Sequence, residues 1–420
     1  MTLQTQTLLT HHLANGLQIV GCPMPDAESV AVAYFIRTGA RDEHDPALEG
    51  VSHFLEHILF KGTKMLDRQQ LDQAFTRVGA KRNGFTSFEY TVYYVQVLSE
   101  YLSEAFDLLS AMMYPRFLES EFEAEKEVIL NEIARVEDRP QTLTQFRLMR
   151  SYFGDHPLGK NVLGSPESIR AMTLEQMRTY WQHRYVAPNV IISIAGKFAW
   201  EPFVLAASRY GTLWQSGQVG RQAFPYEPAQ ARNLILTNPQ LKQQNLMLAM
   251  PMVEMGSPDF EAAFLGASML GRAQGSRLYW QIVHKGLAAS ASASLWAMEG
   301  TGLLLMRANT TPDNAPEVLV VLRAELALFL EKGATNDELS RAKALWIGDI
   351  LRNQDFPYSQ MWSLALDWVV KGRLVSREEL IERIENVTMD DVLRVFHRFP
   401  LRKKQIVTTY GPLSEASFSW

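Results

Sequence analysis

The feature of this sequence that most constrains its fold is a series of predicted strands and helices that occurs twice along the chain. Apolar alternation predicts the strands, and apolar residues at helical spacing predict the helices. In the first half the series is strands over 16–20 and 30–37, helices over 48–60 and 67–78, one or two strands over 83–97, and helices over 102–113 and 119–136. In the second half it is strands over 233–237 and 244–250, a helix over 260–270, strands over 288–306, and helices over 315–332 and 336–353. This recurrence predicts a duplicated domain.

The length of the chain also favours two domains, because 420 residues exceed what one hydrophobic core ordinarily supports. We expect an α+β protein built from two homologous α/β sandwiches of similar size, each a mostly antiparallel sheet with helices packed on it. The stretch 211–230 contains several Gly, Gln and Pro residues and little periodicity. We therefore predict an N-terminal domain over 1–215, a linker over 216–230 and a C-terminal domain over 231–420.

The composition excludes several classes of protein. Hydrophobic residues make up 47% of the chain and charged residues 21%, a balance typical of globular proteins. The net charge is −5 and no dense Lys/Arg block occurs, so we expect no nucleic-acid partner. Charge interrupts the apolar runs before membrane-spanning length and no signal peptide is evident, which predicts a cytoplasmic protein without a membrane partner. The single Cys22 permits neither an intrachain disulfide nor a thiolate metal cluster.

The segment HFLEH carries the strongest chemical motif of the chain, and it lies only in the first half. His53 and His57 are four residues apart on a predicted helix, so both imidazoles can bind one metal ion. Glu56 would lie beside this ion without binding it and could take a proton from a bound water. The order His-x-x-Glu-His is the inverted zinc-peptidase motif. The alternative is a chance spacing of two of the nine histidines, so a third ligand must be found.

The segment EKEVILNEI offers that third ligand. Glu125 and Glu132 are seven residues apart, two helical turns, and therefore share a face of the predicted helix. The other glutamates of this helix are best interpreted as a solvated face. Glu132 is flanked by the apolar Val128, Ile129 and Ile133, which predicts a position at the core boundary. A carboxylate there needs a partner such as a metal ion.

Several segments together resemble the pitrilysin or insulinase family of metallopeptidases, which includes mitochondrial processing peptidase. These segments are HFLEH with the following ILFKGT, then NGFTSFEYTVYY, EKEVILNEI, HPLGKNVLGSPESI and YVAPNVIISIAGKF. The resemblance covers essentially the first half of the chain and is weaker in the second. It implies that His53, His57 and Glu132 bind Zn²⁺, that Glu56 activates the metal-bound water, and that Glu125 supports the site from nearby.

The same resemblance implies a substrate-binding segment, Asn83-Gly84-Phe85-Thr86, in which Asn83 holds the substrate backbone. The family more often has Ala at the position of Gly84. An extended peptide would pair with the sheet edge near these residues, so main-chain hydrogen bonds would supply much of the affinity. Glu89 is either an acceptor for a ligating histidine or an ordinary surface glutamate.

The second half departs from the family at two positions. Many members have an Arg and a Tyr there that reach the substrate, but the matching positions in this chain are Ile282 and Ala289. Arg277, His284 and Lys285 are nearby basic residues that could substitute. The departure resembles heterodimeric members in which a homologous partner subunit supplies the Arg/Tyr pair. We therefore expect such a heterodimer, with a homodimer as the alternative.

Three functions are compatible with these observations. The first is a zinc-dependent endopeptidase that cleaves unfolded or short peptides in a chamber between domains or subunits. The second is a non-catalytic scaffold or peptide-binding subunit of a processing-peptidase-like complex. The third is a chaperone that binds zinc and peptides without turnover. The endopeptidase is favoured, because both histidines, the base and the third carboxylate are all present.

Overall fold

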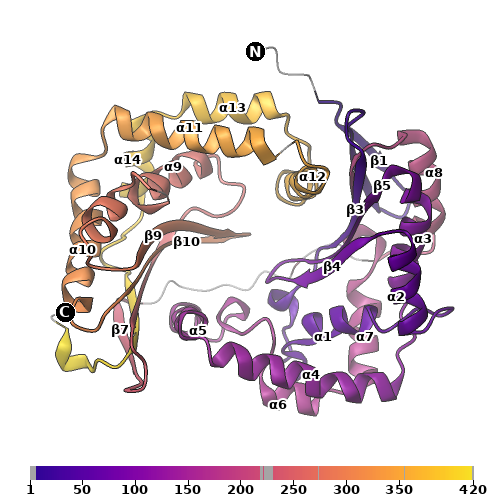
Figure 1. The fold of residues 1–420 in the computed structure, drawn as a ribbon, viewed down its shortest axis with the longest axis horizontal. Helices are drawn as coiled ribbons and strands as arrows, with labels where there is room; N and C mark the ends of the chain where they lie inside the picture. Colours follow the sequence, from indigo (N-terminus) through magenta and orange to yellow (C-terminus); the bar gives the residue numbers. More distant parts are fainter. Residues whose placement is uncertain (1–5, 218–220, 222–229, 273, 354, 419–420) are drawn as a thin grey trace. The chain divides into compact units, whose positions relative to one another are not determined.

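The computed structural model describes residues 6–217, 221, 230–272, 274–353 and 355–418. The chain forms two compact units, and each is assembled from three separate segments (Figure 1). Unit 1 comprises Met1–Ala134, Lys160–Phe224 and Ile350–Arg377. Unit 2 comprises Arg135–Gly159, Pro225–Asp349 and Glu378–Trp420. No helix in the described part of the chain has both the length and the apolar character needed to cross a bilayer.

Unit 1 is built on a six-stranded sheet with the order β1-β2-β6-β3-β5-β4. Its strands are β1 (Leu9–His12), β2 (Gln18–Pro23), β3 (Ser29–Ile36), β4 (Lys81–Thr86), β5 (Thr91–Leu98) and β6 (Val190–Gly196). Its helices are α1 (Val51–Leu59), α2 (Arg68–Arg77), α3 (Leu102–Met112), most of α4 (Glu119–Glu137), α6 (Pro166–Ala171), α7 (Leu174–Arg184), α8 (Trp200–Gly211) and α12 (Pro357–Lys371). Only β2 and β6 pair in parallel. The strand β4 forms one edge of this sheet.

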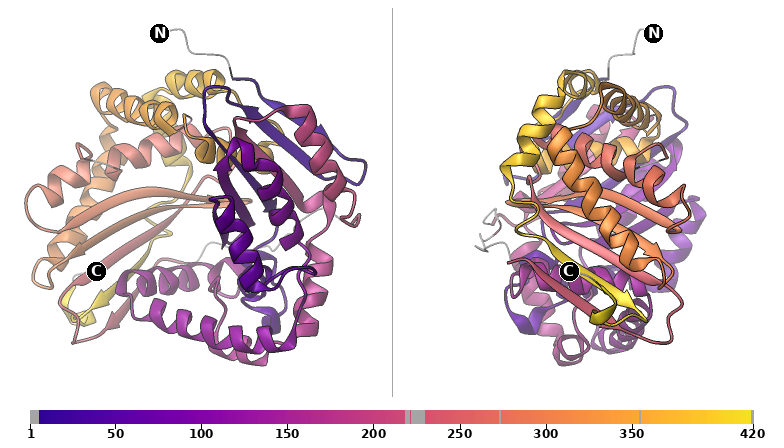
Figure 2. Two further views of the ribbon diagram at one scale, coloured as in Figure 1. Left: turned by 45° about the vertical axis from the view of Figure 1, so that its right-hand side comes forward. Right: turned by 90° about the vertical axis from the view of Figure 1, so that its left-hand side faces the viewer.

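Unit 2 is built on a five-stranded sheet with the order β7-β11-β8-β10-β9. Its strands are β7 (Arg232–Thr237), β8 (Gln244–Met252), β9 (Ser290–Met298), β10 (Thr301–Thr310) and β11 (Ile406–Gly411). Its helices are α5 (Pro140–Phe153), α9 (Phe260–Gly271), α10 (Ala315–Lys332), most of α11 (Asn336–Asn353), α13 (Arg377–Asn386) and α14 (Met389–Arg398). Helices α9 and α10 pack on strands of this sheet (Figure 2).

The two sheets share one topology. When β1 is set aside, the strands of each sheet follow the same order across the sheet: first, fifth, second, fourth and third in the chain. In each sheet the first and fifth strands are parallel, and the other neighbours are antiparallel. The predicted α+β class with two similar, mostly antiparallel domains is therefore confirmed.

Each half of the chain contributes one helix to the unit that is formed mainly by the other half. Helix α12 packs on β6, β3 and β2 of unit 1, and α5 packs on β11 and β8 of unit 2. The unit 1 face under α12 is apolar, since alternate residues of β3 (Ala31, Ala33 and Phe35) are buried together with Met361 and Leu364 of the helix. The compact units therefore differ from the contiguous ranges 1–215 and 231–420 expected from the sequence. The expected linker 216–230 lies largely outside the described residues.

The predicted series has a helix over 119–136 and none that corresponds to α5. Pro140 is the first residue of α5. The first turn of a helix tolerates proline because the missing N–H has no acceptor within the helix there.

Candidate metal centre

Helix α1 carries the HxxEH motif on a firmly fixed first turn. Its apolar residues Val51, Phe54 and Leu55 are fully buried, which fixes the rotation of the helix. The buried carboxylate of Glu43 accepts hydrogen bonds from the Gly50 N–H at 2.7 Å and the Ser52 N–H at 2.8 Å. It thereby satisfies two main-chain donors that the helix cannot satisfy itself. Sequence reasoning missed Glu43, because nothing in the local sequence marks a carboxylate that acts at a helix start several residues later.

The three predicted ligands lie together. His53 Nε2 and His57 Nε2 each lie 3.7 Å from Glu132 Oε2, and the two imidazole centroids are 4.6 Å apart. One ligand atom from each of these residues lies within 4.8 Å of the others. Two ligands at tetrahedral zinc distances are about 3.3 Å apart, so only small side-chain shifts are needed to enclose an ion. Two imidazoles and one carboxylate are a donor set that suits zinc.

The helix α4 brings Glu132 to the histidines with more solvent contact than we expected. Ile129 and Ile133 are buried, as predicted, but Val128 is 48% exposed and the Glu132 side chain is 41% exposed. Glu132 therefore lies at the core boundary, as expected, although Val128 does not cover it on one side. A half-exposed carboxylate suits a ligand on the open side of a site that substrate must enter.

The protonation of His53 favours metal binding. Burial, assisted by the neighbouring His57, lowers the pKa of His53 to about 3. The imidazole is therefore neutral, the form in which histidine binds metals. Its Nδ1 atom is buried and has no hydrogen-bond partner among the described residues.

Glu125 positions the second histidine. Its Oε1 atom lies 2.7 Å from His57 Nδ1, and its other oxygen forms an ion pair with the Lys61 ammonium group. With Nδ1 as the donor, the lone pair of His57 Nε2 is left on the side of Glu132. Burial lowers the pKa of His57, but the hydrogen bond with Glu125 and the nearby carboxylates outweigh this and raise it. Burial raises the pKa of Glu125, but the hydrogen bonds with His57 and Lys61 and their charges outweigh this and lower it.

Glu56 has the properties of a proton carrier. Its carboxylate is buried and accepts a hydrogen bond of 3.0 Å from the Thr86 hydroxyl. Burial raises the pKa of Glu56 to about 7, although the charge of His57 opposes this. A carboxyl group that titrates near neutrality can both take up and release a proton under ordinary conditions.

The segment 83–86 lies on the edge strand β4, and its residues face alternate sides. Thr86 and Gly84 face Glu56; a Cβ atom at Gly84 would lie 3.0 Å from Glu56 Oε1 and 2.8 Å from a ring carbon of Phe60. Phe85 faces the other way, and its ring stacks on Trp362 of α12 with centroids 4.9 Å apart. The Asn83 side chain is exposed on the same face as Phe85. The Phe85 side chain is therefore packed inside unit 1, and the main chain of β4 is what the edge exposes.

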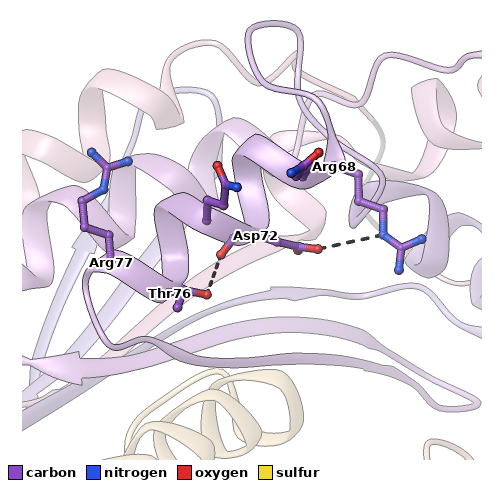
Figure 3. A pocket seen from close by; sticks show the side chains of 6 residues that line it. Arg68, Asp72, Thr76 and Arg77 are labelled. Atoms are coloured by element: carbon purple, nitrogen blue, oxygen red, sulfur yellow. Dashed lines mark hydrogen bonds and ion pairs between the residues drawn. The ribbon is translucent and has the colours of Figure 1, made fainter.

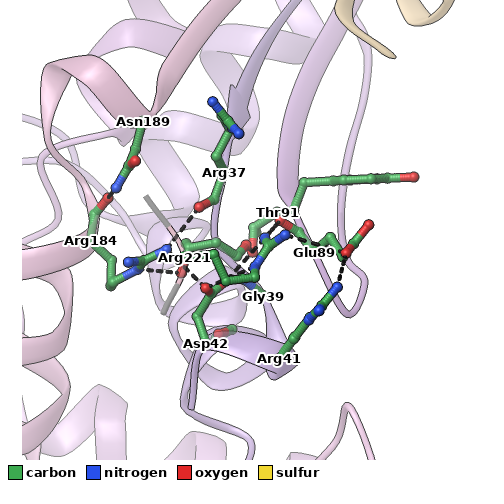
Figure 4. Close-up of polar contacts among 12 residues, drawn as sticks. Arg37, Gly39, Arg41, Asp42, Glu89, Thr91, Arg184, Asn189 and Arg221 are labelled. Atoms are coloured by element: carbon green, nitrogen blue, oxygen red, sulfur yellow. Dashed lines mark hydrogen bonds and ion pairs between the residues drawn. The ribbon is translucent and has the colours of Figure 1, made fainter. Parts of the chain in front are cut away.

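Glu89 does not accept a hydrogen bond from a ligating histidine, contrary to one of our two expectations. Its Oε1 atom accepts from Arg41 at 2.5 Å and from Arg221 at 3.3 Å (Figure 4). Arg221 and Arg184 also pair with the buried Asp42. The carboxylate that contacts a predicted histidine ligand is that of Glu125, not that of Glu89. Sequence reasoning missed this cluster because Arg221 is 132 residues from Glu89.

Two other regions contain no second group of metal ligands among the described residues. A hollow of about 590 Å³ lies along α2, where Asp72 pairs with Arg68 at 4.0 Å (Figure 3). It is a solvated helix surface without a buried charge. In unit 2, Ile282 is fully buried and Ala289 has no polar side chain. Arg277 is held by Glu338 at 2.7 Å.

Known proteins resemble the chain over most of its length. Residues 23–166 match the family described as Insulinase (Peptidase family M16), and residues 171–345 match the one described as Peptidase M16 inactive domain. An uncharacterized zinc protease of Bacillus subtilis is 28% identical over 380 residues, which cover 90% of this chain and 92% of that protein. One of Streptomyces coelicolor is 29% identical over 420 residues, which cover 97% of this chain and 90% of that protein.

Solved structures share the fold. The structure of a protease from Helicobacter pylori has a TM-score of 0.88 at 21% identity and covers 96% of this chain and 99% of its own. A peptidase M16 inactive domain from Pseudomonas fluorescens has a TM-score of 0.85 at 21% identity and covers 97% of this chain and 98% of its own. At this identity the likeness concerns the fold alone.

Proposed function

Because the chain belongs to the insulinase family (peptidase family M16), whose relatives here are named zinc proteases, we propose that it is a zinc-dependent endopeptidase. In this proposal His53, His57 and Glu132 hold the zinc ion and Glu56 moves the proton. The observation that carries it is the convergence of the three ligand atoms within 4.8 Å beside a buried carboxyl group that titrates near neutrality.

In this proposal, different residues of the chain have different roles in peptide hydrolysis. When bound, zinc supplies a Lewis acid that polarises the scissile carbonyl and increases the acidity of a nearby water. Glu56 takes a proton from the attacking water and later delivers it to the leaving amine nitrogen. Thr86 holds the Glu56 carboxylate by its hydrogen bond, and Glu125 keeps His57 in the required orientation.

The substrate class follows from the edge strand. β4 pairs with β5 on one side only, so its outer main-chain groups can pair with an added strand. An extended peptide can bind in this way, whereas most main-chain groups of a folded protein are already paired within that protein. We therefore propose unfolded or short peptides as substrates, bound along 83–86 mainly through the main chain.

We further propose that full activity requires a homologous partner subunit. The family positions for the substrate-binding Arg and Tyr are occupied here by the buried Ile282 and by Ala289. The nearby Arg277 is committed to Glu338 and to the carbonyl of Gly333. A partner that carries the Arg/Tyr pair would complete the site. Full peptidase activity of the isolated monomer would contradict this part of the proposal.

The decisive test of the catalytic assignment is Glu56→Gln. The amide retains the shape of the side chain and an acceptor for Thr86, and position 56 is not among the metal ligands. We expect one zinc ion per chain in both proteins and a decrease in kcat of about 10²- to 10⁴-fold in the variant. Metal analysis and cleavage of an unstructured fluorogenic peptide, with and without chelator, measure both quantities. Normal turnover by the variant would refute the role of Glu56, and zinc-free wild-type protein would refute the metal site.

A further inference from the structure

A polar cavity of about 320 Å³ lies within unit 2, between α5 and the sheet. Helix α5 contributes Gln141, Thr142 and Gln145, and the strands β8, β9 and β10 contribute the opposite wall. On β10, Arg307 is paired with Ser292 of β9, and this pair shares one face of the sheet. The volume is that of a site for a small ligand or for one or two peptide side chains.

Arg307 is the only charged side chain among the described residues that line this cavity. Its Nε atom is buried and has no hydrogen-bond partner in the described part of the chain. Burial lowers the pKa of Arg307, and no carboxylate among the described residues counteracts that effect. An incompletely solvated guanidinium group without a counter-charge is destabilising. When a folded protein retains such a guanidinium group in a cavity, its positive charge is available to bind an anionic ligand.

The neighbours of Arg307 in the cavity are neutral hydrogen-bonding groups, and two of them bond to each other. Asn309 and its cross-strand partner Asn245 lie two residues along the same face, and the Asn309 amide donates to Asn245 Oδ1 at 2.8 Å. Ser292 and Gln145 add a hydroxyl and an amide to the lining. The cavity thus combines one planar cation with neutral donors.

We propose that Arg307 and the polar side chains around it bind a carboxylate group, either an acidic side chain or the C-terminal carboxylate of a peptide. A guanidinium group matches a carboxylate by two parallel N–H···O bonds. One positive charge balances one carboxylate but leaves a phosphate dianion partly uncompensated, so the charge of the cavity favours the former. This site is independent of the metal centre and of the proposed catalytic function, because all of its residues belong to unit 2.

The test compares three short N-acetylated peptides by isothermal titration calorimetry on the full-length, zinc-loaded protein. The first has a glutamate side chain and an amidated C-terminus, the second has glutamine in its place, and the third has glutamine and a free C-terminus. We expect at least one of the two carboxylate peptides to bind at least about tenfold more tightly than the neutral peptide. Which of the two binds better identifies the source of the carboxylate. Mass spectrometry after each titration verifies that the peptides are intact.

The variant Arg307→Met should abolish this preference, and its melting temperature should rise because the uncompensated charge is removed. Arg402→Met is the matched control: it removes an exposed arginine of the same unit outside the cavity lining and should leave the preference unchanged. Arg307→Lys retains the charge but not the paired donors, so it should retain a preference weakened several-fold.

Three results would overturn the proposal. Equal binding of the neutral and carboxylate peptides would show that the cavity has no such selectivity. A preference that persists in Arg307→Met would place the carboxylate elsewhere, for instance on the metal ion. Inorganic phosphate that binds more tightly than either carboxylate peptide, with the same dependence on Arg307, would make the site one for phosphate.

Discussion

Glu125 allows a quantitative test of how the metal centre is held, through the isosteric change Glu125→Gln. The carboxylate contacts His57 Nδ1 at 2.7 Å and also pairs with Lys61, and the side chains of Glu125 and Lys61 are 5% and 14% exposed. The amide can still accept a hydrogen bond from His57, but the bond loses its charge. A charge-assisted hydrogen bond contributes about 1.5–3 kcal/mol. We therefore expect zinc affinity to decrease about 10- to 100-fold.

The same substitution leaves the Lys61 ammonium group without its counter-charge. Removal of one partner from a buried ion pair costs about 3–5 kcal/mol, and the partial exposure of Lys61 should reduce this to about 2–3 kcal/mol. The double variant Glu125→Gln/Lys61→Met removes the isolated charge. It should recover most of the stability without recovering zinc affinity, which separates the two effects.

Zinc affinity is measured by competition with a chromogenic chelator, and stability by urea unfolding of the zinc-free protein. Glu127→Gln is the matched control, since Glu127 is exposed on the same helix. It should leave both quantities unchanged within about 0.5 kcal/mol. Wild-type zinc affinity in Glu125→Gln, or an equal loss in Glu127→Gln, would refute the role of Glu125.

Three further predictions concern unit 1. Burial raises the pKa of the Cys22 thiol to about 11, so the native protein should react with a thiol reagent at pH 8 only after denaturation; rapid reaction of folded protein would contradict the buried position. Trp362→Ala removes the half-buried ring that packs on Phe35 and Phe85 and should lower the free energy of unfolding by about 2–3 kcal/mol in urea titrations; a change below about 0.5 kcal/mol would show that α12 contributes little. Gly84→Ala places a methyl group 3.0 Å from Glu56 Oε1, so kcat should change while zinc content does not; zinc loss would show that the crowding reaches the ligands.

Periodicity predicted most of the elements that build the metal centre. The strands β2 and β3 and the helices α1, α2 and α4 appear within a few residues of their predicted ranges, because each has one apolar face that its own sequence specifies; β1 was not predicted. Spacing alone predicted that His53 and His57 share one face of α1 and that Glu125 and Glu132 share one face of α4. Their approach to one another across two helices followed from the chemistry of a metal site and from the family resemblance.

Features that depend on how loops fold back or on contacts between distant segments were not predictable in the same way. Glu43 stabilises the start of α1 only because a loop returns its carboxylate to that point, and Glu89 meets Arg221 only in the folded chain. The side chains of segment 83–86 alternate between two packed faces. The sequence predicted the strand but could not indicate that Trp362 of α12 covers the Phe85 face.

Because α5 of the first half packs on the sheet of unit 2 and α12 of the second half packs on the sheet of unit 1, the two halves depend on each other during folding. Neither the segment before the expected linker nor the segment after it contains every helix that covers its own sheet. A chain synthesised from the N-terminus therefore leaves the apolar face that contains Phe35 open until residues near 365 have emerged. Each half therefore completes its own sheet only with a helix from the other half, so neither half encodes a complete folded unit.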